Sequence, residues 1–136
     1  MVSVNLACAK VFNRSIGLPL PSTLVRLREE NGDLIERCEL PGEIEIKGPQ
    51  LMSGYWGNKE ETTRVLQDGW LKSGDIGQFD KQGFLHLVDR KKDMILVSGF
   101  NVYPSEIEGV IAKIAGISEG VAIAVDDKKT GERVKL

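Results

Sequence analysis

Short apolar segments alternate with turn residues over residues 1–91, and this spacing restricts the fold that they can form. The segment GEIEIKG at 42–48 alternates acidic and branched apolar residues with a period of two. That period predicts a strand with one face in the core and the other in water. The sequences NGD at 31–33 and DKQG at 80–83 are typical of turns between strands. The pattern predicts a small antiparallel, barrel-like unit.

One short helix is expected to interrupt these strands. Asn58 is a suitable N-cap with Glu61 three residues later, and the pair Asp68-Gly69 is expected to end the helix. Tyr55 and Trp56 precede the helix between two glycines. An aromatic pair in this setting favours packing in the core over forming the wall of a ligand site.

The pattern changes after Arg90. Two short apolar segments flank Ser98-Gly99 and predict a hairpin, and Pro104 then opens a helix in which Ser105 and Glu108 have the spacing of a capping box. The helix carries an apolar stripe made of Ile107, Val110, Ile111 and Ile114.

The last segments complete the prediction of an α+β protein. GVAIAVD at 120–126 is nearly continuous in apolar residues and predicts a buried strand, and RVKL at 133–136 resembles the start of another. We therefore expect two folding units, a β-barrel subdomain at 1–91 and a truncated α+β subdomain at 92–136. The little sheet available to a buried strand leads us to expect a fragment of a longer protein.

Composition excludes several function classes. The 136 residues contain 18 Lys and Arg against 20 Asp and Glu, a net charge of −2. This balance gives no electrostatic attraction to nucleic acid. The apolar segments are too short to span a bilayer, and the N-terminal residues do not resemble a signal peptide. Cys8 and Cys38 suggest neither a disulfide framework nor a metal site. A cytoplasmic location is expected.

The triplet SGD at 73–75 is the first candidate for chemistry. Glycine weakens a strand, and a bulge or a closely approaching ligand usually explains its presence. The carboxylate of Asp75 can accept two hydrogen bonds side by side, which suits the vicinal diol of a ribose. The alternative is a turn aspartate that accepts hydrogen bonds from neighbouring backbone N–H groups.

The run DRKKD at 89–93 is the second candidate. It is compatible with an exposed connector between two strands. A nucleic-acid site that used Phe100 and Tyr103 for stacking is disfavoured by the acidic residues on both sides of the run. His86 lies in an alternating strand without a catalytic partner nearby in sequence, so a structural role is expected.

Taken in order, these segments resemble the adenylate-forming acyl-CoA synthetases, in particular bacterial long-chain fatty-acid–CoA ligases. The resemblance runs from Val2 to Leu136, and its most specific part is DGWLKSGDIGQFDKQGFLHLVDRKKDMILVSGFNVYPSEIE. It implies a two-step reaction: a carboxylate first reacts with ATP, with Mg²⁺, to give an acyl-adenylate, and coenzyme A then displaces AMP to give a thioester. A small C-terminal domain moves relative to the large domain between the steps.

The resemblance also assigns roles to individual residues. Asp75 corresponds to the aspartate that holds both ribose hydroxyls of the nucleotide, and Arg90 to an arginine that contacts the same ribose. Lys92 falls at the interdomain hinge. Residues Ser98, Gly99 and Phe100 correspond to a loop that reaches the active site for thioester formation.

Three motifs of the family do not occur in these residues: the phosphate loop, the aromatic-Thr-Glu motif and the C-terminal catalytic lysine. We therefore expect no catalytic residue and no metal ligand here, and an isolated fragment without activity. ATP or AMP, Mg²⁺, coenzyme A and a fatty acid would be ligands of the parent enzyme. The parent is also expected to associate peripherally with the inner membrane, and the fragment to self-associate through exposed edges.

Two alternatives stay open. One is another acid-activating enzyme, such as an aryl-CoA ligase or a peptide-synthetase adenylation domain. The other is a module that binds a nucleotide or a partner without catalysis.

Overall fold

The structure is a computed structural model that describes residues 1–5 and 13–136. These residues form two compact units, Met1–Leu87 and Val88–Leu136. Cys8 lies outside the described residues, and Cys38 is an exposed free thiol. No helix in the described ranges is long and apolar enough to cross a membrane.

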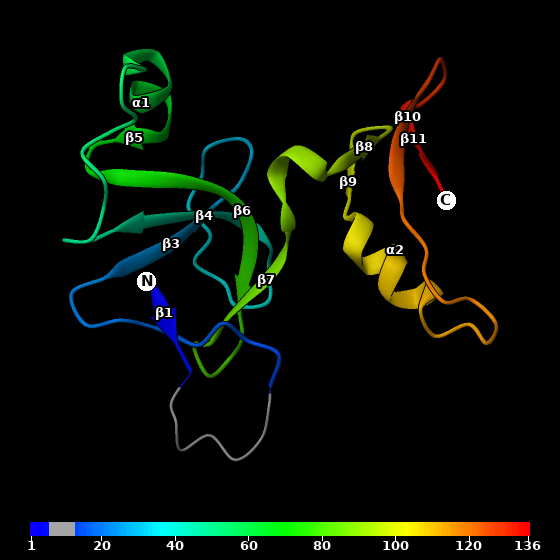
Figure 1. The fold of residues 1–136 in the computed structure, drawn as a ribbon, viewed down its shortest axis with the longest axis horizontal. Coiled ribbons are helices and arrows are strands. Elements are labelled where there is room, and N and C mark those ends of the chain that lie inside the picture. Colours follow the sequence, from blue (N-terminus) through cyan, green and yellow to red (C-terminus); the bar gives the residue numbers. More distant parts are fainter. Residues whose placement is uncertain (6–12) are drawn as a thin grey trace. The chain divides into compact units, whose positions relative to one another are not determined.

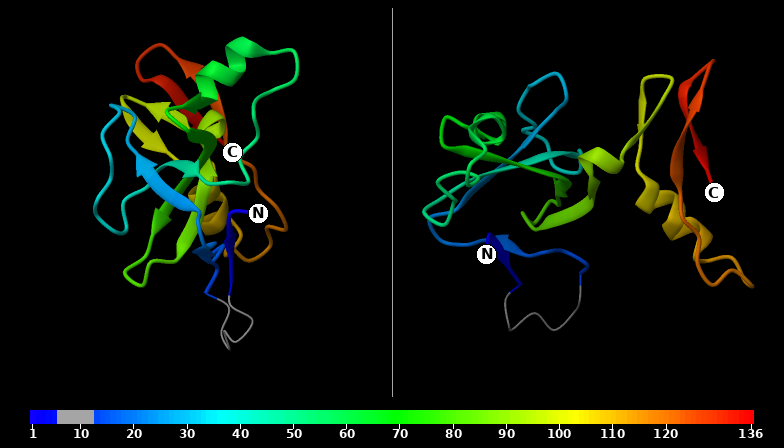
Figure 2. Two further views of the ribbon diagram at one scale, coloured as in Figure 1. Left: turned by 90° about the vertical axis from the view of Figure 1, so that its left-hand side faces the viewer. Right: turned by 45° about the horizontal axis from the view of Figure 1, so that its top comes forward.

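The first unit consists of antiparallel strands and one helix (Figure 1). Its main sheet has the strand order β3-β4-β6-β5, and β7 pairs with β6. The sheet curls into a half-barrel (Figure 2), which confirms the predicted barrel-like unit and α+β class. A separate two-stranded sheet is formed by β1 and β2. The elements are β1 (Ser3–Val4), β2 (Leu18–Pro19), β3 (Leu24–Arg28), β4 (Gly42–Lys47), α1 (Lys59–Val65), β5 (Leu66–Gln67), β6 (Trp70–Phe79) and β7 (Leu85–Arg90), whose last three residues belong to the second unit.

The core of this unit lies on one face of β3 and β4. Leu27 pairs with Ile44 across the two strands, and both side chains are buried together with Ile46 and Leu85. Burial of each such side chain stabilises the fold by about 1.5–3 kcal/mol. The apolar residues of the alternating segment are therefore core residues, as the period of two predicts.

The opposite face of β4 is buried as well, and the expectation that this face lies in water is wrong. Glu43 is 9% exposed and Glu45 only 1% exposed. Burial of Glu45 is tolerated because Arg26 and Arg28 on the neighbouring strand β3 donate hydrogen bonds to its carboxylate. The alternation indicates which residues share a face, but not whether that face is covered.

Helix α1 begins as predicted and ends earlier. The side chain of Asn58 accepts a hydrogen bond from the backbone N–H of Glu61, at 3.0 Å, which confirms the N-cap. The helix ends at Val65, so the expectation that Asp68-Gly69 ends it is wrong. Both residues have positive φ, 51° and 78°, and they form the two-residue turn between β5 and β6.

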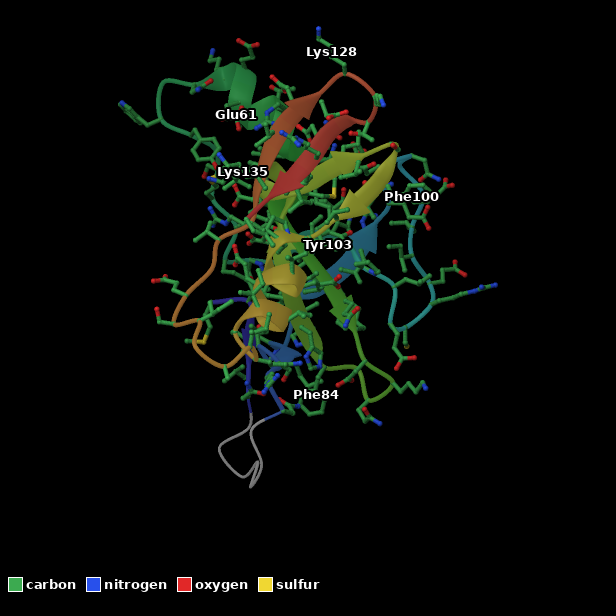
Figure 3. All side chains as sticks on the ribbon, turned by 90° about the vertical axis from the view of Figure 1, so that its right-hand side faces the viewer. Glu61, Phe84, Phe100, Tyr103, Lys128 and Lys135 are labelled. Carbon is green, nitrogen blue, oxygen red and sulfur yellow. The ribbon has the colours of Figure 1, made fainter. Side chains whose placement is uncertain are left out.

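The second unit contains a four-stranded sheet with the order β10-β11-β8-β9. Ser98 and Gly99, with φ of 51° and 83°, form the tight turn of the predicted hairpin between β8 and β9. Figure 3 shows Phe100 beside this turn and Lys128 at the tip of the loop between β10 and β11. The elements are the 3₁₀ helix η1 (Lys91–Asp93), β8 (Ile95–Val97), β9 (Phe100–Val102), α2 (Pro104–Ile111), β10 (Ile123–Asp127) and β11 (Gly131–Lys135).

Helix α2 does not use the predicted capping box. Its N-cap residue is Tyr103 and Pro104 is the first helical residue, so Ser105 already lies inside the helix. The backbone N–H of Ser105 donates to the side chain of Asp89, at 3.0 Å. The carboxylate that satisfies this end of the helix therefore comes from the preceding connector rather than from Glu108.

Strand β10 and the residues before it are less buried than predicted. Ala122 is buried, and its N–H donates to the Glu108 carboxylate at 2.9 Å. Val121 and Ile123, however, are half exposed, as are Val110 and Ile114 of the predicted helical stripe. Within the described residues, an apolar face of this unit is therefore uncovered.

Candidate functional site

A bulge in β6 presents the first candidate residues. Strand β6 pairs with β4 through Glu43 opposite Ile76 and through Glu45 opposite Lys72. Between these two pairs β4 has one residue, whereas β6 has three, residues 73–75. The SGD triplet therefore bulges out of the ladder, as a glycine within a strand indicates.

Gly74 allows this bulge to form. Its φ is +74°, in the left-handed region that side chains other than hydrogen disfavour. A Cβ atom at this position would have no atom within 4 Å, so the requirement for glycine is conformational and the space beside the bulge is open. The backbone N–H of Asp75 donates to the Ser73 hydroxyl at 3.1 Å, which closes a local turn.

Asp75 is half buried at the end of the bulge, and the strand becomes tightly packed directly after it. At Gly77 a Cβ would lie 2.8 Å from the carbonyl oxygen of His86 and 2.7 Å from Ile44 Cδ1. The backbone of β6 is therefore held close to its neighbours on one side of the bulge. Asp75 therefore lies between Gly74, which has open space beside it, and the tightly packed segment at Gly77.

A buried ionic cluster lies on the other side of the bulge. Arg26 and Arg28 donate to the Glu45 carboxylate through their Nε atoms, at 2.6 and 2.8 Å. Burial disfavours the charged form of Glu45, but the hydrogen bonds from Arg28 and Arg26 outweigh it and hold the pKa of this carboxyl below its ordinary value. The guanidinium of Arg26 also stacks over Trp70, 3.9 Å from the ring centroid.

Sequence reasoning missed this cluster. Arg26 and Arg28 alternate with the same period as Glu43 and Glu45, so complementary charges on two neighbouring strands were the available signal. The pairing partners are 17 and 19 residues apart, however, and the register that joins them is fixed by the fold.

Arg90 and Lys92 lie in the second unit. Arg90 ends β7, is exposed, and donates its backbone N–H to the Asp89 side chain at 2.8 Å. Lys92 is exposed in the middle of η1. The connector is therefore solvated, as expected. Asp75 belongs to the first unit and Arg90 to the second.

Lys92 borders a hollow of about 510 Å³ in the second unit, between the start of α2 and the chain that leads into β10. Asp89 and Glu108 also line the hollow, and both accept backbone hydrogen bonds. The carboxylates of Asp89 and Glu108 therefore hold the neighbouring backbone in place. Ser98, Gly99 and Phe100 are at the exposed hairpin turn and do not line this hollow, and Phe100 is 75% exposed.

The aromatic pair before α1 is not part of the core, so the prediction of core packing is wrong. Trp56 is wholly exposed and Tyr55 is 48% exposed, and both line a shallow hollow with Thr62. The backbone N–H of Tyr55 donates to the Thr62 hydroxyl at 2.9 Å. Because this hydrogen bond fastens the loop to the helix, the two rings are not needed to hold it.

His86 has a local structural partner. Its Nε2 lies 3.0 Å from Asp80 Oδ2, and Asp80 also accepts the backbone N–H groups of Gln82 and Phe84. The hydrogen bond to His86 lowers the pKa of Asp80. The histidine therefore helps to hold the loop between β6 and β7. Among the described residues, no group of three or more His, Cys, Asp or Glu could hold a metal ion.

Comparison with known proteins identifies the family. No family model matches the chain. Among solved structures, it is similar to ATP-bound MatB from Rhodopseudomonas palustris, with 35% identity and a TM-score of 0.90 over 98% of this chain and 27% of that one. It is also similar to the o-succinylbenzoate CoA synthetase MenE from Bacillus subtilis bound to its acyl-adenylate, with 35% identity and a TM-score of 0.79 over 89% of this chain and 25% of that one. The chain belongs to the adenylate-forming acyl-CoA synthetase superfamily, as its motifs indicate.

Within this superfamily, curated relatives are long-chain-fatty-acid–CoA ligases. The chain is 52% identical to that of Yersinia pestis over 136 residues, all of this chain and 24% of the relative. It is 48% identical to that of Bacillus subtilis over 122 residues, or 89% of this chain and 22% of the relative. The chain thus spans about a quarter of the length of these ligases.

Proposed function

We propose that this chain is a segment of a long-chain fatty-acid–CoA ligase, and that it carries the ribose contacts and the interdomain hinge of that enzyme. The bulge at residues 73–75 is the observation that carries the proposal, because it places a half-buried carboxylate directly after a glycine that has open space beside it. Residues 1–91 would then end the AMP-binding domain, and residues 92–136 would begin the small C-terminal domain.

The chemistry of Asp75 fits the ribose of ATP or AMP. The two oxygens of an ionised carboxylate accept hydrogen bonds from two adjacent hydroxyls, and a half-buried position strengthens both bonds. Arg90 can donate to ribose oxygens from its planar guanidinium. Neither group acts on the reacting phosphate, so their role is to hold the nucleotide while the carboxylate of the fatty acid reacts with it.

Lys92 would serve as the pivot between the two half-reactions. It lies in a single turn of 3₁₀ helix in which none of the three residues is buried. Few packing contacts of the 3₁₀ turn itself must break when its torsions change. The turn at Ser98, Gly99 and Phe100 would be carried to the active site for thioester formation, and its exposure leaves it accessible there.

The parent enzyme would use ATP, Mg²⁺, a fatty acid and coenzyme A, and would act in the cytoplasm with peripheral association at the inner membrane. The 136 residues alone would be inactive. Much of the electrostatic stabilisation in this chemistry comes from groups that position the phosphates, and the phosphate loop of the family does not occur in these residues. The uncovered apolar residues of the second unit favour self-association of the isolated chain.

A second acid-activating function is supported by other structural neighbours. The amide bond synthetase McbA from Marinactinospora thermotolerans shares 39% identity with this chain, with a TM-score of 0.80, over 89% of this chain and 24% of that one. The segment itself is therefore compatible with acceptors other than coenzyme A. The higher identity to the fatty-acid ligases, 52%, favours the thioester reaction.

The ribose role is tested in a full-length ligase that contains this segment. Asp75→Ala should raise the KM for ATP and slow adenylate formation by about tenfold or more, since two charge-assisted hydrogen bonds are lost. Pyrophosphate release measures adenylation. The exposed Asp126→Asn is the matched control and should leave both constants unchanged. An unchanged KM for ATP in the Asp75 variant would exclude the ribose role.

A further inference from the structure

The bulge that presents Asp75 is open to a competing register. Strand β6 has two more residues than β4 between the flanking pairs, so a slip by two residues would absorb the bulge into a regular ladder. A shift by two keeps every side chain on its own face of the sheet. The alternation of apolar and polar residues therefore does not by itself prevent it.

The ionic cluster of β3 and β4 reaches across to β6 at this point. Arg26 is paired with Glu45 across β3 and β4, and its guanidinium continues over β4 to stack on Trp70, the first residue of β6. The ammonium of Lys47 also faces the same ring, with its Nζ 5.8 Å from the centroid. Three strands are thus connected through one buried carboxylate and one aromatic ring.

A slip would replace that ring with a cation. Lys72 lies two residues after Trp70 on the same face of β6, and it would move about 7 Å along the strand into the position of the ring. The ammonium would then lie between Arg26 and Lys47. An attractive cation–π arrangement would become a repulsive group of three positive charges.

The apolar face of the sheet supports the same register. In the observed ladder Ile46 is opposite Leu71, and after the slip it would be opposite Ser73. A buried branched side chain would then lose an apolar cross-strand partner. Both faces of the sheet thus favour the bulged register. On the charged face, the interaction is attractive in the bulged register and repulsive in the slipped register.

We propose that Arg26, Glu45 and Trp70 form a register lock that keeps the 73–75 bulge open and thereby positions Asp75. The lock concerns the strand register, which can be measured without a ligand. Only its consequence for the nucleotide rests on the proposed function. Arg26, Glu45 and Trp70 are positioning residues, and Asp75 makes the contact.

The register is measured by NMR on the 136-residue chain. The wild type should show a cross-strand backbone NOE between residues 45 and 72. In Trp70→Leu and in Glu45→Gln this NOE should weaken, and one between residues 45 and 74 should appear. Amide exchange at Gly74 and Asp75 should also change by about tenfold. Arg26→Lys keeps the charge but loses the planar stack, and it serves as a milder variant if the others fail to fold.

Leu27→Val is the matched control, because it perturbs the apolar core of β3 on the face opposite Arg26. It should lower stability while the NOE between residues 45 and 72 persists. The proposal is wrong if the lock variants that fold, Arg26→Lys included, keep the wild-type NOE pattern and differ from the wild type only in stability.

A parallel titration with AMP separates the two proposals. If the wild type binds AMP, the variants with a slipped register should bind it about tenfold more weakly, as for the loss of Asp75. If the wild type does not bind AMP, the ribose proposal fails for this chain, and the NOE pattern still decides whether the lock exists. Normal AMP affinity in a variant with a demonstrably slipped register would contradict the positioning role.

Discussion

At the scale of single residues, the candidate site depends on the backbone conformation of one glycine. Gly74 has a positive φ and open space around it, whereas Gly109 in α2 has equally open space and a helical backbone. These two glycines therefore separate the conformational contribution from the steric one.

Gly74→Ala should destabilise the first unit by about 1 kcal/mol or somewhat more, because a Cβ disfavours φ near +74°. Gly109→Ala should stabilise the second unit by roughly 0.5–1 kcal/mol, since alanine is the better helix former. Urea unfolding, followed by NMR signals from each unit, measures both changes. Equal effects of the same sign would contradict the conformational explanation.

The Glu45 carboxylate makes the stability of the first unit dependent on pH. Its pKa in the folded state is lowered from the ordinary value of 4.5. Its contribution is therefore complete above about pH 4.5 and is lost as the pH falls through the lower pKa of the folded state. Asp80 contributes with the same sign, from its ordinary value of 3.8 downward.

Urea unfolding followed by tryptophan fluorescence should show stability falling below this pH in the wild type. Glu45→Gln should be less stable at neutral pH and should show a shallower decline on acidification. A decline as steep as that of the wild type would assign the acid sensitivity to other groups.

Much of this site could be predicted from residue types alone. Glycine inside a strand indicated the bulge, which the structure shows, whereas the diol contact of the adjacent carboxylate stays a prediction. Burial of Glu45 could not be predicted, because it depends on two arginines that only the strand register brings to it. The exposure of Trp56 was missed for a related reason: a hydrogen bond from a backbone N–H to Thr62 fixes its loop without help from the rings.

At the scale of secondary-structure elements, the end of β7 and the 3₁₀ turn that follows it have two separate tasks. Asp89, near the end of β7, accepts the backbone N–H of Ser105 in α2, and Lys92 lies in the adjoining 3₁₀ turn. Because Asp89 precedes Lys92 and Ser105 follows it, a large change in the torsions at Lys92 would have to break this hydrogen bond.

Lys92→Pro tests the pivot in a full-length ligase. Proline fixes φ near −65° and removes a backbone donor, so it restricts the torsions of the 3₁₀ turn. Thioester formation should fall by about tenfold or more, while pyrophosphate release remains near the wild-type rate. Lys92→Ala keeps the backbone free and should preserve both steps. Equal losses in the two half-reactions of the proline variant would contradict the hinge role.

Turn residues predicted the presence of hairpins and helices better than they predicted the residues at which these elements begin and end. Asp68-Gly69 and Ser98-Gly99 each mark a two-residue hairpin turn, but the first was assigned to the end of a helix because β5 contains only two residues. The predicted capping box in α2 failed because Pro104 occupies the first helical position and moves Ser105 inside. A spacing rule cannot show which neighbour supplies the cap.

At the scale of the whole molecule, the two units differ in how much apolar surface they bury. The first unit buries Leu27, Ile44, Ile46 and Leu85 as one cluster. In the second unit, the segment 120–126 has the composition of a buried strand, yet Val121 and Ile123 remain half exposed. Composition predicts the preference of a strand for burial, whereas the segments available to cover it decide the outcome.

The central claim for the whole molecule is that Asp75 and Arg90 contact the ribose of the nucleotide. NMR titration of the chain with AMP tests this claim most directly. Because Asp75 is proposed to bind the 2′- and 3′-hydroxyls, AMP should shift the amide signals of residues 73–75 and of Arg90, and 2′,3′-dideoxy-AMP should shift them far less. Asp75→Asn should reduce the AMP response. Equal shifts with both nucleotides, or none with AMP, would contradict the ribose site.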